Sequence, residues 1–162
     1  MKHSEKSVIV TQVIVRVCYV LLLIGIIGLP LTVYKDSIPF MHDFAELNLL
    51  KVFGKNFIVP FYLVVPAGYA VLICLDKLLA NVKQNKVFDH SSVTLLRIIS
   101  YCCFYAAAVG MVSYFIIAAI RTPLESIFIL SLGEGFVGLV VRVVKNVFEK
   151  AIEIKEENDL VI

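Results

Sequence analysis

Hydrophobic residues are gathered into four long, continuous runs instead of alternating with polar ones. The runs lie at about 12–33, 57–78, 96–120 and 125–145, and more polar segments at 34–56 and 79–95 separate the first three. A helix of about 20 apolar residues crosses the hydrocarbon core of a bilayer, and it pairs its own backbone polar groups as lipid requires. The pattern predicts an all-α fold, a four-helix transmembrane bundle whose helices extend into the cytosol.

The composition agrees with a membrane location. Of the 162 residues, 60% are hydrophobic and only 17% are charged, whereas soluble domains are about half apolar and a quarter charged. A soluble chain of this size could not bury so much apolar surface. We therefore expect residues 1–162 to form a single integral membrane domain in contact with the lipid bilayer. The net charge of +2 gives no reason to expect direct contact with nucleic acid.

The basic residues predict the orientation. Four spans put the N-terminus, the inner loop 79–95 and the tail 149–162 on one side of the membrane, with the outer loop 34–56 on the other. The first side carries 11 of the 15 lysines and arginines, and the other side carries Lys35, Lys51, Lys55 and Arg121. Since basic residues are enriched on the cytoplasmic side, we predict a multi-pass protein of the cytoplasmic membrane with both termini in the cytoplasm.

One carboxyl group lies near the middle of a predicted span. Glu134 is the only Asp, Glu, Lys or Arg at that depth in any of the four runs. Placing a bare carboxylate there would cost about 3 kcal/mol of insertion free energy. We therefore expect the neutral form, which donates a hydrogen bond. By depth, the candidate partners in this intramembrane polar site are Tyr69, Tyr105, Ser113 and Tyr114. Two interpretations stay open, a polar clamp between helices and a site for a proton, a cation or a polar ligand.

Small residues surround Glu134 on the fourth run. Ser131, Gly135 and Gly138 recur at helical spacing, and residues 106–110 of the third run include three alanines and a glycine. Small residues let helix backbones approach closely in lipid. We predict helix packing through Ser131, Gly135 and Gly138, either within the chain or in a homo-oligomer.

Nothing in the chain resembles a catalytic constellation or a cofactor motif. The four cysteines lie within or at the edges of spans, where a thiol behaves as a small apolar group, and the three histidines are dispersed. We therefore expect no catalytic residues, no metal and no cofactor. The alternative, an enzyme acting on lipid, would have to use Asp89, His90, Ser91 and Ser92, which are better explained as helix-capping residues.

The C-terminal tail carries both acidic and apolar residues. Glu153, Glu156, Glu157 and Asp159 precede Leu160 near the end of the chain. One interpretation is a solvated helix end. The other is a docking element, with these five residues as its contacts, that binds either the basic inner loop of the same chain or a cytosolic partner.

Two segments resemble a known family. Asn85-Lys86-Val87-Phe88 and Leu95-Leu96-Arg97-Ile98 are similar to the inner loop of the YoaS-like family of small bacterial four-helix membrane proteins, a domain of unknown function. The stretch from Gly133-Glu134 to Glu156-Glu157-Asn158-Asp159-Leu160 is similar to the last span and the tail of that family. Val161 stands where the family usually has threonine, and the inner loop lacks the usual proline before its phenylalanine.

The resemblance implies a bacterial inner-membrane protein without an assigned biochemical activity. Genes of this family commonly lie beside a small helix-turn-helix regulator, which implies a membrane-anchored regulatory pair. The favoured hypothesis is therefore a non-enzymatic membrane protein acting as a regulatory or sensor partner of a cytosolic transcriptional regulator. The alternative is a small oligomeric proton- or cation-coupled transporter or channel that uses Glu134.

Overall fold

The computed structural model describes residues 2–33, 58–84, 89–120 and 125–159. The described chain forms four helices, α1 (Lys2–Val33), α3 (Ile58–Lys83), α4 (His90–Ile120) and α5 (Glu125–Asp159). The predicted outer loop 34–56 and Leu160 lie outside the described residues. So does the segment 85–88 that carries part of the family resemblance.

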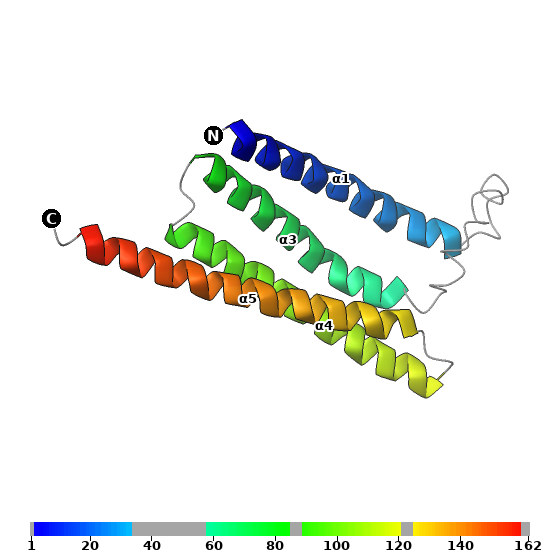
Figure 1. Cartoon of the computed structure of the whole chain (residues 1–162). Coiled ribbons are helices and arrows are strands. Elements are labelled where there is room, and N and C mark those ends of the chain that lie inside the picture. The colour runs from blue at the N-terminus through cyan, green and yellow to red at the C-terminus, as the bar shows by residue number, and fades with distance from the viewer. Residues whose placement is uncertain (1, 34–57, 85–88, 121–124, 160–162) are drawn as a thin grey trace.

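The four helices run alternately up and down the molecule (Figure 1). Each is long and apolar enough to cross a membrane. The all-α, four-helix transmembrane architecture predicted from the hydrophobic runs is thus confirmed. Because the number of crossings is even, the N-terminal end of α1 and the C-terminal end of α5 lie at the same end of the bundle.

All four helices are longer than the apolar runs that predicted them. α1 begins at Lys2, α3 continues to Lys83, α4 begins at His90, and α5 continues to Asp159. With 35 residues, α5 is about 52 Å long, whereas the hydrocarbon core is about 30 Å thick. A substantial part of α5 must therefore project beyond the membrane, and the charges of this helix lie mainly on its C-terminal part.

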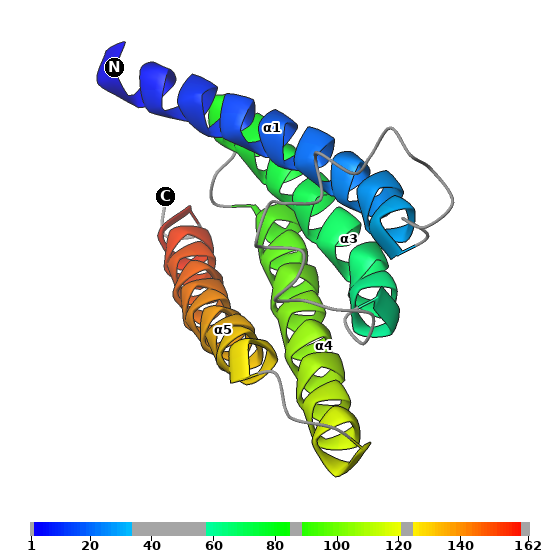
Figure 2. The ribbon, with the colours of Figure 1, turned by 90° about the vertical axis from the view of Figure 1, so that its right-hand side faces the viewer.

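Extensive packing occurs only between helices that follow one another in the chain. α1 packs on α3, α3 packs on α4, and α4 packs on α5, with the last contact the largest. The helices therefore form a curved row in chain order (Figure 2), with α1 and α5 at its two ends. Most of the outward surface is apolar, since at most 22% of any spanning window is buried inside the protein.

A hydrogen bond at the α1–α3 contact repairs a proline defect. Pro30 has no N–H, so the carbonyl of Ile26, four residues earlier in α1, loses its normal helical partner. The hydroxyl of Tyr62 on α3 donates to this carbonyl, at 2.6 Å. About two turns away along the same contact, the rings of Tyr19 and Tyr69 pack with centroids 5.9 Å apart. Lipid offers no water to satisfy a free carbonyl, so this hydroxyl stabilises the helix pair.

The core lies mainly between α4 and α5. The buried side chains of these two helices are partly apolar and partly serine hydroxyls. They are Ser92, Val93, Leu96, Ile99, Ser100, Ala106, Ile127, Ser131 and Ile152. Two of the three hydroxyls bond to the backbone: Ser100 donates to Gly138 O at 3.0 Å, and Ser131 donates to Ile127 O at 2.8 Å. The α4–α5 hairpin is therefore the best packed part of the molecule.

Candidate functional site

Glu134 lines a groove that all four helices share. The groove has a volume of about 480 Å³. Its walls are apolar side chains, glycines and the thiols of Cys18, Cys102 and Cys103, and Glu134 of α5 is the only carboxyl group among the lining residues. Among the described residues the Glu134 carboxyl has no hydrogen-bond partner. It is half-buried at the side of the groove, beside Cys103.

The four candidate partners of Glu134 make other contacts. Tyr105 donates to Leu63 O on α3 at 3.3 Å, and Ser113 donates to Val109 O within α4 at 2.7 Å. Tyr69 packs on Tyr19, and the ring of Tyr114 lies 5.2 Å from that of Phe128 on α5. The structure therefore does not bring these four side chains together around the carboxyl group.

The small residues of α5 lie against α4. A Cβ atom on Gly138 would lie 3.1 Å from the Cβ of Cys103, and one on Gly135 would lie 3.6 Å from the Cβ of Ala107. A Cβ atom on Gly110 would overlap the hydroxyl of Ser131. By contrast, Gly133 meets nothing within 4 Å. Ser131, Gly135 and Gly138 thus lie in the contact between α4 and α5 within the chain.

Polar side-chain contacts connect the membrane-distal part of α5 to the start of α4, and one further pair lies within α5 itself. Arg97 Nη2 lies 3.0 Å from Glu149 Oε1, and Lys145 Nζ lies 2.9 Å from Glu149 Oε2. Further toward the end of the helix, His90 Nε2 lies 3.1 Å from Glu156 Oε1. These five residues are called the hairpin clasp below. Ile152, which lies between Glu149 and Glu156 in the chain, is buried. The contact of α5 with α4 therefore continues well past the apolar run.

Among the predicted docking residues, Glu156 belongs to the clasp and the others lie beside it or follow it in the chain. Glu153 and Glu156 line a cleft of about 380 Å³ between the two helices, together with His90, Thr94 and Glu149. Residues 153–158, including Glu157 and the apolar Ile154, are exposed. Asp159 is the last residue of α5, and Leu160 lies outside the described residues. The structure thus places three of the five predicted contacts on one exposed helical end.

The four polar residues at the start of α4 do not converge on one point. Ser92 is fully buried and its hydroxyl accepts a hydrogen bond from Asn81 Nδ2 at 3.3 Å. His90 pairs with Glu156, and Asp89 immediately precedes the first residue of the helix, where its carbonyl accepts a bond from the N–H of Ser92 at 2.9 Å. These contacts serve the helix start and the packing of α3 on α4.

Metal ligands and disulfides are also not assembled in the described ranges. No group of three His, Cys, Asp or Glu side chains there could hold a metal ion. Cys18, Cys74, Cys102 and Cys103 are free thiols on three different helices.

One cluster of polar residues between α4 and α5 was not predicted from the sequence. Arg97, Ser100 and Tyr101 on α4 and Arg142 and Lys145 on α5 surround a small cavity of about 40 Å³. The sequence contains one indication of this cluster, because Arg97 and Arg142 each lie at the boundary of an apolar stretch. Basic residues at such boundaries predict the orientation of the chain but not that they lie close together. That they meet across the α4–α5 contact became visible only in three dimensions.

Four apolar helices with polar extensions define an integral membrane protein. The chain matches the family described as Protein of unknown function (DUF2975) over residues 7–162. It is also 33% identical over 153 residues to the Uncharacterized membrane protein YoaS of Bacillus subtilis (strain 168), an alignment covering 88% of this chain and 92% of the relative. The chain therefore belongs to this DUF2975 family of membrane proteins. No solved structure matches it.

Proposed function

We propose that this protein is a non-enzymatic regulatory protein of the bacterial inner membrane that docks a cytosolic partner on the C-terminal end of α5. Both termini face the cytoplasm in this proposal, as the distribution of lysine and arginine predicts. The family resemblance supplies the candidate partner, a small transcriptional regulator of the helix-turn-helix class. The protein itself makes no direct contact with nucleic acid.

The observation that supports docking is the exposed acidic end of a helix that is already ordered. The clasp and the buried Ile152 hold α5 on α4, while Glu153, Glu157 and Ile154 beside them stay exposed. A partner with a basic surface would therefore bind a preformed helix and would not have to order a flexible tail, which lowers the entropic cost of binding.

The test is charge reversal on the exposed face of α5. The double variant Glu153→Lys with Glu157→Lys should abolish co-purification of a co-expressed regulator, since like charges across an interface oppose binding. The matched control is Glu125→Lys, which alters an exposed carboxyl at the opposite end of α5 and should leave co-purification unchanged. Truncation after Lys150 is less informative, because it also removes the buried Ile152 and the His90–Glu156 pair. If the regulator still binds the double variant, docking on α5 is disproved.

A second candidate function rests on Glu134. A carboxyl group on the wall of a groove shared by four helices, with no hydrogen-bond partner among the described residues, is the kind of residue that marks a proton or cation pathway in membranes. The groove is open on one side, so a transporter or channel of this kind would need a homo-oligomer to close it. It predicts pH-dependent flux into liposomes that Glu134→Gln abolishes and Glu125→Gln preserves. Absence of proton, sodium and potassium flux from liposomes of the unaltered protein would contradict it.

A further inference from the structure

Three cations meet in a small cavity at one membrane boundary. The cavity lies between α4 and α5, with Arg97, Ser100 and Tyr101 on one side and Arg142 and Lys145 on the other. Its volume of about 40 Å³ exceeds the 10–15 Å³ or so that one water occupies by this measure. It therefore has room for the oxygens of one small polar group.

The cavity carries an excess of positive charge. Glu149 is the carboxylate that pairs with both Arg97 and Lys145, and in the described part of the chain Arg142 has no carboxylate partner. Three cations and one carboxylate leave a net charge of +2 around the cavity. The Lys145 side chain is only 16% exposed, so its charge is screened less than an ordinary surface charge, whereas the arginine side chains are more exposed and accessible to a ligand.

The depth of the cavity identifies the membrane boundary. Residues 98–120 after Arg97 contain no charged residue, and residues 126–141 before Arg142 contain only Glu134. The two arginines thus stand at the same end of two antiparallel apolar segments, where lipid phosphates lie. Tyr101 is 61% exposed beside them, which fits the enrichment of tyrosine at membrane interfaces.

We propose that this cavity binds the phosphate of an anionic phospholipid headgroup. Arg97, Arg142 and Lys145 would supply charge-assisted hydrogen bonds to the phosphate oxygens, and Tyr101 would lie against the headgroup. Guanidinium groups suit this ligand because their paired N–H donors match the phosphate oxygens. Basic pockets between transmembrane helices on the cytoplasmic side bind headgroups of this class. The proposal does not depend on a cytosolic partner or on transport.

The test measures lipid binding to the delipidated, detergent-solubilised protein by native mass spectrometry. The probes are dioleoyl phosphatidylglycerol, dioleoyl phosphatidylcholine and inorganic phosphate. The unaltered protein should bind phosphatidylglycerol in preference to phosphatidylcholine, and inorganic phosphate at the same concentration should not displace it. Arg142→Gln should weaken phosphatidylglycerol binding about tenfold, the order expected for one lost charge-assisted contact.

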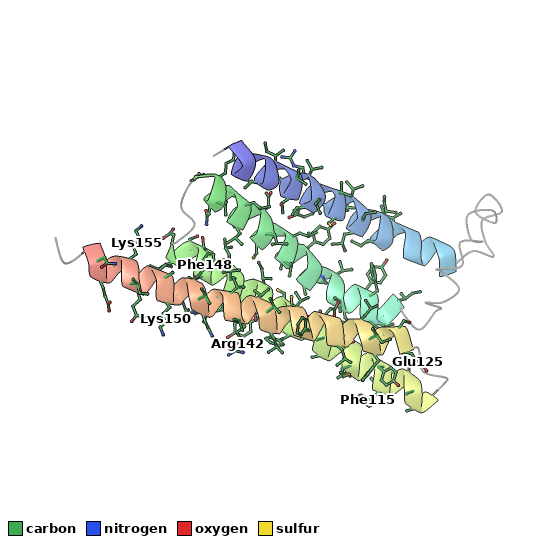
Figure 3. The ribbon with its side chains drawn as sticks, viewed as in Figure 1. Phe115, Glu125, Arg142, Phe148, Lys150 and Lys155 are labelled. Atoms are coloured by element: carbon green, nitrogen blue, oxygen red, sulfur yellow. The ribbon has the colours of Figure 1, made fainter. Side chains whose placement is uncertain are left out.

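Lys150→Gln is the matched control. It removes the same charge from an exposed position of α5 that lies beyond Arg142 toward the C-terminal end of the helix (Figure 3) and does not line the cavity, and it should leave binding within about twofold of the unaltered protein. Arg142 is exposed and lies outside the clasp, so its variant should fold, and Arg97→Gln serves as a second variant expected to weaken binding as well. Equal binding of the two lipids, displacement by inorganic phosphate, or an equal loss in Lys150→Gln would each overturn the proposal.

Discussion

The hydroxyl of Tyr62 donates a hydrogen bond to the one carbonyl of α1 that Pro30 leaves without a helical partner, that of Ile26. Tyr62 and Ile26 are 36 positions apart and lie on different helices. Proline in a spanning helix is tolerated where a neighbouring helix satisfies the freed carbonyl. The proline in α1 and the tyrosine in α3 therefore form one structural unit.

The first prediction removes that hydroxyl. Tyr62→Phe should lower the free energy of unfolding by about 1–2 kcal/mol, because the Ile26 carbonyl is left unpaired in an apolar environment. In a Pro30→Ala background the same change should cost much less, since the N–H of the new alanine can bond to Ile26. The measurement is a double-mutant cycle of thermal stability in detergent. Equal losses in the two backgrounds would show that Tyr62 acts by another route.

The second prediction concerns the closest approach of α4 and α5. Gly110→Ala should destabilise the hairpin by about 1–3 kcal/mol, because the added methyl overlaps the hydroxyl of Ser131. Combining it with Ser131→Gly should restore most of the lost stability, since the small residue moves to the other helix. Gly133→Ala is the control, because its Cβ would meet nothing within 4 Å. A Gly110→Ala variant as stable as the control would contradict the close contact.

The third prediction distinguishes a packing role from a chemical role for Glu134. Glu134→Leu should stabilise the protein in detergent by about 1–2 kcal/mol, because it removes from an apolar groove a polar group that has no hydrogen-bond partner in the part of the chain that the structure describes. Glu134→Gln should have a smaller effect, since the amide stays polar. Chemical unfolding of the three proteins side by side measures the difference. Destabilisation by leucine would instead favour an interhelical clamp through this carboxyl group.

The fourth prediction tests the orientation of the chain. Green fluorescent protein fused after Ile162 should fluoresce, and alkaline phosphatase fused at the same point should be inactive, because both reporters would remain in the cytoplasm. Alkaline phosphatase inserted into the 34–56 loop should be active. An active phosphatase at the C-terminus would reverse the predicted topology, and the docking proposal would then lose its cytosolic partner.

The architecture could be read from the sequence because lipid imposes a strong rule. Four predominantly apolar runs of sufficient length predict four helices, and the expected extension of the helices beyond those runs is seen in α5, which continues to Asp159. Contacts between helices were harder to foresee. Packing of the small residues of α5 on residues 106–110 could be predicted, because small residues permit close approach. Which residue of α4 lies opposite which residue of α5 could not be predicted.

The candidate site was less predictable, since it depends on rotation of the helices about their axes. Depth alone nominated Tyr105 and Ser113 as partners of Glu134, yet both hydroxyls bond to backbone carbonyls. The meeting of Arg97 with Arg142 depends on the same rotation, as does the pairing of Tyr62 with Ile26. The spacing of residues within one helix does not show how far that helix is rotated about its axis relative to its neighbour.

The row of helices in chain order has a consequence for biosynthesis. Because each helix packs extensively only on its predecessor and its successor, every major contact can form as soon as the second of its two helices leaves the translocation machinery. No early segment has to wait for the C-terminus, so the loop-closure cost of each step stays small. The last contact to form would be the largest one, and completion of α5 would therefore be the step that secures the whole assembly.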